Sequence, residues 1–319
     1  MRKLVLMICV LGVVAALGSC GQKDEAEPET AAVTEKPPTD QTSGEYDRPG
    51  HWPKGRDFGK LQGSALDTLR VKKKRFDITR DEYWETRGGV LANDYFEVWY
   101  PPGRMTVTHG MYVFEELMPA RGKLQALLGT APEELLVIKA SYSLEAYKKS
   151  TGRDWWYYSV IKGDSMVMSP VFILERRGIS HIAVPHEYYQ WAIRKITREA
   201  APRWLEEGMA SYLSGEEKIL IDQAYEFKSG EISMSPSRVE QILEHEPARR
   251  ESRLAYYHSY RMVVKLIETY GEDKLKQAIL LMGEGHTTAD AFAEAYGIDY
   301  DDLLKVASDY EIDLTKKEG

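Results

Sequence analysis

The chain has 319 residues, of which 43% are hydrophobic, and its formal net charge is −8. This length and composition allow a packed core in one or two domains. A nucleic-acid partner is excluded on charge, because proteins that bind nucleic acids present a strongly basic face to the phosphates.

The N-terminus has the pattern of an export signal. Arg2 and Lys3 precede an apolar run at 4–17, which is too short for the ~20-residue helix that crosses a membrane. The run closes in Leu-Gly-Ser-Cys at 17–20, which resembles the lipobox of bacterial lipoproteins, where the cysteine is lipidated and becomes the first mature residue. An ordinary secretory signal with a chance cysteine is the alternative. We predict a signal peptide at 1–19 and a lipid anchor on Cys20 that holds the protein on the periplasmic or cell-surface side of a bacterial membrane.

The next two segments carry little that a core would bury. Residues 20–56 contain five prolines among Glu, Thr, Gly and Lys, which predicts a solvated tether. Residues 57–93 are highly charged and include the basic run at 72–75. We expect this segment to be helix and loop packed on the domain surface. A functional basic patch is the less favoured interpretation, because acidic residues follow directly.

Regular structure is predicted from residue 94 onward. In chain order we expect a strand at 95–100, a helix through 111–128, a strand at 135–138, a helix at 144–150 and a hairpin within 155–168. From Ile179 the pattern is helical, and Gly208 and Ala210 are expected to let two helices approach closely. Strands followed by helices predict an α+β domain over 94–312, with a tail at 313–319.

Two short motifs lie in the helical half. The first is His186-Glu187-Tyr188-Tyr189-Gln190, and the second is the run Trp-Leu-Glu-Glu-Gly-Met-Ala at 204–210. Zinc peptidases place two histidines four residues apart on one helix, so that both imidazoles face the same metal ion. The glutamate beside the first histidine accepts a proton from the metal-bound water, and a third ligand comes from another element.

The motifs resemble those of the gluzincin clan, and specifically of peptidase MA-like domains. The resemblance implies that His186 is the first zinc ligand, Glu187 the general base and Glu207 the third ligand, while Glu206 points away from the site. It extends from about residue 94 to 312 and includes the run at 254–260, where Tyr256 matches a cleft tyrosine able to donate to an oxyanion. Ordinary packing is the alternative for Tyr256, since the chain has 20 tyrosines. The implied fold is a zincin, thermolysin-like architecture with a small N-terminal sheet before a helical half.

The chain departs from the family pattern at one ligand. Gln190 stands where the family has its second histidine, and an amide oxygen is a weak, neutral ligand for zinc. Three interpretations follow. Zinc binds through His186 and Glu207 with Gln190 or another donor, such as His258; or the metal is lost and the cleft still binds peptides; or only the fold is shared.

The sequence therefore predicts a cell-envelope lipoprotein with a zinc metallopeptidase-like domain. If the domain is active, it hydrolyses peptide bonds; the alternative is an inactive pseudopeptidase that binds a peptide or protein partner. In either case the predicted strand at 155–161 is a candidate sheet edge, to which a peptide can add its backbone.

The anchor is tested by Cys20→Ser. Because acylation requires the thiol, the variant should accumulate as an unlipidated precursor, detected by detergent partition and mass spectrometry. Normal maturation and membrane retention of this variant would contradict the lipoprotein assignment.

Overall fold

The computed structural model describes residues 70–72, 89–101, 106–224, 227, 234–245 and 249–310. The predicted signal peptide at 1–19, the lipidation site Cys20, the tether at 20–56 and the tail at 313–319 lie outside these residues. The chain divides into two units at residues 43 and 44, and every described residue belongs to the second unit.

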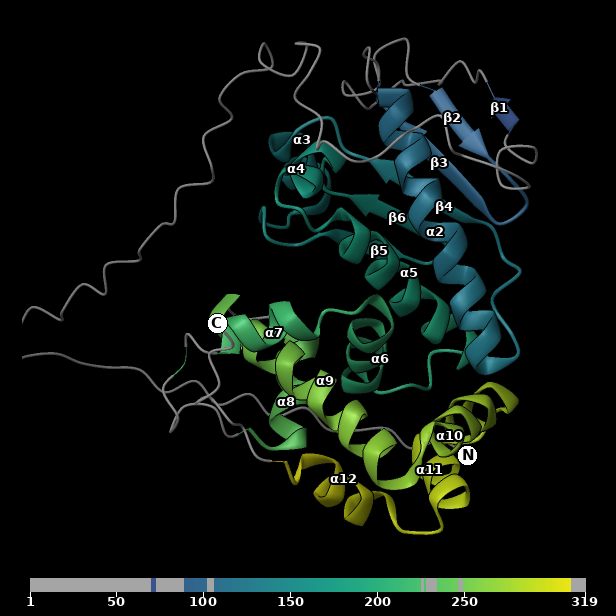
Figure 1. Ribbon diagram of the computed structural model, residues 1–319, viewed down its shortest axis with the longest axis vertical. Helices are drawn as coiled ribbons and strands as arrows, with labels where there is room; N and C mark the ends of the chain where they lie inside the picture. Colours follow the sequence, from purple (N-terminus) through teal and green to yellow (C-terminus); the bar gives the residue numbers. More distant parts are fainter. Residues whose placement is uncertain are drawn as a thin grey trace, which may run out of the picture. The chain divides into compact units, whose positions relative to one another are not determined.

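A six-stranded mixed sheet occupies the N-terminal part of the described chain (Figure 1). Its strands are β1 (Arg70–Lys72), β2 (Gly89–Ala92), β3 (Phe96–Tyr100), β4 (Leu136–Ala140), β5 (Ser159–Lys162) and β6 (Ser165–Met168). Their order is β1-β2-β3-β4-β6-β5, with β3, β4 and β6 parallel and the other pairs antiparallel. The hairpin β5–β6 turns at Gly163, which has a positive φ of 58°, and leaves β5 at one edge of the sheet.

The sheet is covered by helix α2 (Thr106–Leu128), which packs against β2 and β3. Val113, Leu117 and Leu124 recur at helical spacing and are fully buried, so one stripe of α2 faces the sheet. Gly129 follows the helix with a φ of 76°, a conformation that costs glycine little.

Helices make up the rest of the domain. They are α3 (Leu144–Thr151), α4 (Val171–Arg176), α5 (Ser180–Ile196), α6 (Arg203–Ser214), α7 (Glu217–Ala224), α8 (Pro236–His245), α9 (Arg249–Tyr270), α10 (Glu272–Glu284), α11 (Thr288–Tyr296) and α12 (Tyr300–Ser308). Helix α5 contacts α2 and β5 on one side and α6 on the other, so it joins the sheet to the helical half (Figure 1). The predicted order of a small sheet followed by helices is confirmed. None of the described helices has the length and apolar character needed to cross a membrane.

The segment before residue 94 differs from its prediction as helix and loop. Within it, β1 and β2 form strands, and β2 pairs with β3 through the register Val90 to Trp99 and Leu91 to Val98. The folded sheet therefore begins before Asp94. Each strand has four residues or fewer, which is too short for alternation to show among neighbouring charges. The predicted strand at 155–161 is also shorter, since β5 begins at Ser159.

Gly208 determines how closely α6 and α9 pack. A Cβ atom at this position would lie 2.3 Å from the backbone oxygen of Ser259 and 2.6 Å from Val263 Cγ2. Both distances are shorter than van der Waals contact, and the nearer atom belongs to the α9 backbone. The close approach expected at Gly208 is therefore present, and it positions the part of α6 that carries Glu207.

We expect Gly208→Ala to lower the free energy of unfolding by about 1–3 kcal/mol, because the added methyl group forces the two helices apart. The matched control is Gly122→Ala in α2, where nothing lies within 4 Å of the added Cβ. Removing this helical glycine should instead stabilise the fold by about 0.5–1 kcal/mol. Urea unfolding of the full-length protein, followed by circular dichroism, measures both changes. Equal effects at the two positions would contradict the close packing of α6 on α9.

Candidate functional site

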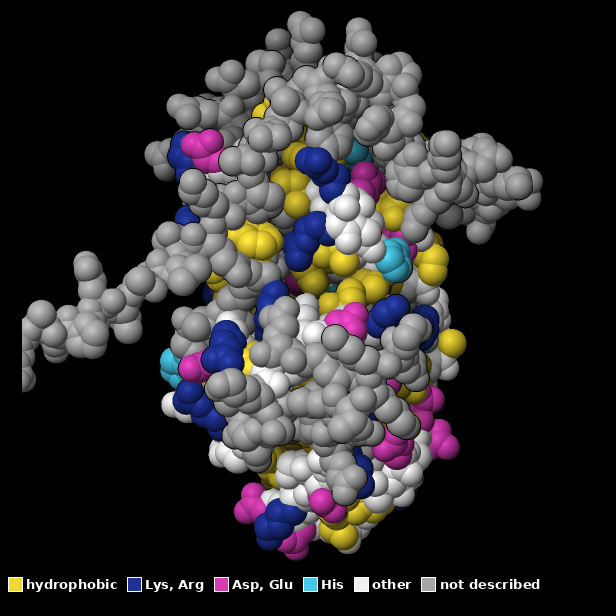
Figure 2. Space-filling model, turned by 60° about the vertical axis from the view of Figure 1, so that its left-hand side comes forward, with side chains coloured by type: hydrophobic (Ala, Val, Ile, Leu, Met, Phe, Trp, Pro, Cys, Tyr) yellow, Lys and Arg dark blue, Asp and Glu magenta, His cyan; other side chains and the backbone are white. Residues whose placement is uncertain are grey.

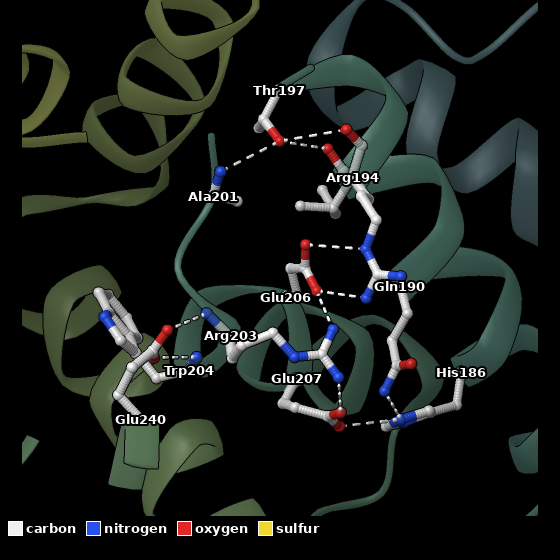
Figure 3. A network of polar contacts seen from close by, with 11 residues as sticks. His186, Gln190, Arg194, Thr197, Ala201, Arg203, Trp204, Glu206, Glu207 and Glu240 are labelled. Atoms are coloured by element: carbon white, nitrogen blue, oxygen red, sulfur yellow. Dashed lines mark hydrogen bonds and ion pairs between the residues drawn. The ribbon is translucent and has the colours of Figure 1, made fainter. Parts of the chain in front are cut away.

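The first motif lies on a buried stretch of α5. His186 and Gln190 are one turn apart, so their side chains leave the helix on the same face. Gln190 Nε2 lies 2.9 Å from His186 Nε2. Glu207, on the neighbouring helix α6, places its Oε2 3.4 Å from the same nitrogen. The structure therefore brings the three predicted ligands together around His186 Nε2 (Figure 3).

The opposite side of the imidazole faces a second carboxylate. His186 Nδ1 lies 2.9 Å from Oε2 of Glu216, a buried residue directly after Gly215, where α6 ends. The same oxygen accepts a hydrogen bond of 2.8 Å from Ser211 Oγ. Glu216 was not identified from the sequence, because no motif contains it. It lies near His186 because the chain changes direction at Gly215, the residue that ends α6.

The two carboxylates determine the charge of the imidazole. Burial alone would lower the pKa of His186, but Glu216 and Glu207 outweigh it and raise the pKa well above its usual value. Burial alone would raise the pKa of Glu207, but the contacts with His186 and the charge of Arg203 hold it below its usual value. Both carboxylates therefore favour the protonated form of the buried ring.

Glu187 lies beside this group and contacts the sheet. Its Oε2 accepts a hydrogen bond of 2.5 Å from Ser159 Oγ, at the start of the edge strand β5. Both side chains are buried, and burial raises the pKa of Glu187 to about 7. A carboxyl group with this pKa can gain or lose a proton near neutrality. Ser159 was also missed from the sequence, since a serine in a strand carries no signal of this contact.

Helix α6 is held in place by charged partners. Glu206 Oε1 and Oε2 accept bonds of 3.1 and 2.6 Å from Arg194, and Arg203 also pairs with Glu206 (Figure 3). Glu206 thus points away from His186, as the resemblance implies.

The N-terminus of α6 is capped from another helix. At the first turn of α6 the backbone N–H groups of Arg203 and Trp204 donate to Glu240 of α8, at 2.8 and 3.0 Å. The Glu240 side chain therefore caps α6, because the N-cap residue Pro202 has no side-chain acceptor for these N–H groups.

A cleft opens over these residues. It is lined by His186, Glu187, Gln190 and Glu207 together with Tyr256 of α9, so the structure places all five predicted residues at one site. His258 is not among the described residues that line this cleft, and its Nδ1 contacts the hydroxyl of Tyr310 instead.

The donor set does not fit a catalytic zinc ion. Among the residues that the structure describes, no group of three or more His, Cys, Asp or Glu side chains is placed to hold a metal. His186 Nε2 and Glu207 supply two strong donors, whereas a catalytic zinc site has three. Whichever way its amide is turned, Gln190 adds only a neutral group, and Glu216 contacts the other nitrogen of the ring.

The comparison with protein families agrees with the predicted resemblance. Residues 178–310 match the family described as Peptidase MA superfamily, which confirms the resemblance for this part of the chain. No curated protein of similar sequence was found. Among solved structures, a mutant M1 zinc metallopeptidase from Deinococcus radiodurans is similar, with 17% identity and a TM-score of 0.41 over 75% of this chain. The chain spans about half of that protein, since the match covers 51% of it.

The raised pKa of Glu187 predicts how stability changes with pH. Unfolded, this carboxyl ionises near pH 4.5, but folded it ionises near 7, so the folded state binds the proton more tightly. Unfolding free energy is therefore lost as pH rises from about 4.5 to 7, on the order of 3 kcal/mol from this one group.

Glu187→Gln should remove this loss, so the variant gains stability relative to the unaltered protein over that pH range. Glu133→Gln, at an exposed carboxylate, is the control and should leave the profile unchanged. Urea unfolding at a series of pH values tests this. Parallel profiles for the Glu187→Gln variant and the unaltered protein would show that Glu187 titrates normally.

Proposed function

We propose that this protein is a cell-envelope lipoprotein, anchored through Cys20, whose metallopeptidase-like domain binds a peptide segment in its cleft without cleaving it. One observation carries the proposal: the amide of Gln190 lies 2.9 Å from His186 Nε2, where the metallopeptidase pattern has a second imidazole. The structure has a cleft at this position, but the residues around it provide one strong ligand fewer than a catalytic zinc site has.

The charged groups of the site lie against one another, although His186 Nδ1 makes no hydrogen bond with the described residues. His186 contacts Glu207 and Glu216, Glu207 lies 3.9 Å from Arg203, and Glu187 accepts from Ser159. Buried charges are stable only when paired in this way. Opposite charges this close offset one another without a metal ion, which supports a binding role over a metal-dependent one.

The cleft offers a peptide both backbone and side-chain contacts. Ser159, Val160 and Ile161 of the edge strand β5 line it, and an extended peptide can hydrogen-bond to such an edge. Tyr256 lines the opposite, helical side and carries a hydroxyl that can donate or accept. These features support a peptide, or an extended segment of a partner protein, as the ligand.

Zinc-dependent hydrolysis is a second candidate that one contact favours. Metal-bound histidines commonly donate their other ring N–H to a carboxylate, and Glu216 stands at that position against His186 Nδ1. This candidate requires a third protein donor in addition to His186 and Glu207. The two functions therefore differ in one measurable property, the affinity for zinc.

We expect the full-length protein, purified in detergent, to bind zinc weakly and Gln190→His to bind it far more tightly. The new imidazole lies one turn after His186 on the same face of α5. Removing only the hydrogen-bond partner of a metal ligand weakens metal affinity about 10- to 100-fold. An added ligand should therefore strengthen zinc affinity by more than about 100-fold. Competition with a chelator measures both affinities.

Gln125→His, on the exposed side of α2, is the matched control and should leave zinc affinity unchanged. Peptide hydrolysis is followed in parallel with a broad peptide library. Tight, stoichiometric zinc in the unaltered protein, with cleavage abolished by Glu187→Gln, would overturn the binding role and establish a peptidase with an unusual ligand set.

A further inference from the structure

Among the described residues, none forms a hydrogen bond with the hydroxyl of Tyr158, which lines the cleft together with His186 and Glu187. Tyr158 directly precedes the edge strand β5. Its carbonyl accepts a hydrogen bond of 2.8 Å from the N–H of Ser169, the residue after β6, which fixes its backbone to the sheet. The cleft therefore holds a firmly placed tyrosine whose hydroxyl is available to a ligand.

Two contacts orient the ring of Tyr158. It meets the imidazole of His186 edge-on, with the ring centres 6.4 Å apart, and Arg177 Cζ lies 5.9 Å from its centre. Burial raises the pKa of Tyr158 and the charge of Glu216 raises it further, so the hydroxyl keeps its proton and can donate at neutral pH. A ring that is already packed loses little freedom when its hydroxyl binds a ligand.

A second wall of the cleft comes from α7. Ile219, Leu220 and Gln223 line the cleft, and their spacing places them on one face of the helix. Leu220 is buried with Tyr257 and Tyr260, whereas Ile219 is only partly buried and belongs to none of the hydrophobic clusters formed by the described residues. Ile219 thus offers the cleft an apolar side chain that the core does not use.

The edge strand and this apolar side chain together favour one kind of ligand. A peptide added to the edge of β5 presents successive side chains to opposite faces, so alternate side chains can be selected by the protein while the backbone supplies hydrogen bonds. Figure 2, turned so that the left-hand side of Figure 1 comes forward, shows hydrophobic side chains gathered across the middle of that face. The page of that face suits apolar groups at alternate positions of a ligand.

We propose that the cleft selects an extended peptide segment with apolar side chains, in which a backbone carbonyl accepts a hydrogen bond from Tyr158 and an apolar side chain packs on Ile219. The inference rests on the proposed function, because it specifies the ligand of the same cleft. Tyr158 and Ile219 are not candidate zinc ligands, so replacing them tests recognition and leaves the zinc donors in place.

The experiment compares two labelled peptides on the full-length protein in detergent, with a chelator present. One alternates valine with serine, and its counterpart has threonine at each valine. Threonine has nearly the shape of valine but carries a hydroxyl in place of one methyl group, so the pair isolates the apolar contact. We expect the valine peptide to bind at least about fivefold more tightly, because an apolar contact gives the added hydroxyl no partner.

Tyr158→Phe should weaken the binding of both peptides about three- to tenfold and leave their ratio unchanged, because the lost hydrogen bond is to the backbone that they share. Tyr142→Phe is the matched control, since it removes the hydroxyl of an exposed tyrosine that does not line the cleft. Fluorescence anisotropy of the labelled peptides measures both affinities.

Ile219→Thr should remove most of the preference for the valine peptide. Ile221→Thr, on the same helix but not lining the cleft, is the control and should keep the preference. Should Ile219→Thr fail to fold, as judged by circular dichroism, Ile219→Ala must show the same loss, because it also removes most of the apolar surface.

The outcomes separate the two proposals. Equal binding of both peptides to the unaltered protein would overturn apolar selection and leave peptide binding intact. Unchanged affinities in Tyr158→Phe would overturn the role of its hydroxyl, and an unchanged preference in the Ile219 variants would overturn the role of Ile219. Binding of neither peptide would overturn the proposed function itself.

Discussion

The site depends on a buried imidazole held between two carboxylates. His186 faces Glu207 through one ring nitrogen and Glu216 through the other, with Gln190 completing its surroundings. A buried charge without a partner costs several kcal/mol, so each of these groups constrains the others. Because the partners come from α5, α6 and the turn after α6, the contact also specifies how these elements pack.

Much of the surrounding structure places α6 so that this contact can form. Gly208 allows α6 to lie against the α9 backbone, Glu240 caps its first turn, and Glu206 connects it to α5 through Arg194. Gly208, Glu240 and Glu206 are not among the described residues that line the cleft. Their common effect is to hold Glu207 at the distance from His186 that the site requires.

The sequence predicts the helical residues of this site well and the connecting residues poorly. Helix periodicity places His186 and Gln190 on one face, and the resemblance adds Glu207 and Tyr256. Glu216 and Ser159 could not be predicted, because their positions depend on a turn and on a neighbouring strand. The same limit applies to β1 and β2, whose identity as strands depends on pairing with β3 and not on their own short, charged surroundings.

Gln190, where the family pattern has a second histidine, also contributes hydrogen-bonding groups to the site. A neutral amide can form hydrogen bonds with both His186 and Glu207, so it fits between them without a metal. In the proposed function, Gln190 therefore stands in a metallopeptidase-like cleft that binds a ligand without the ion. A binding protein built on this fold needs only the cleft, the edge strand and a set of side chains that select the ligand.

The most direct test of this account is anomalous diffraction at the zinc edge from crystals of the unaltered protein grown with zinc. The account predicts at most a low-occupancy anomalous peak between His186 Nε2 and Glu207, with the Gln190 amide in contact with both side chains. A full-occupancy peak at that position, with the Gln190 oxygen among its ligands, would contradict it.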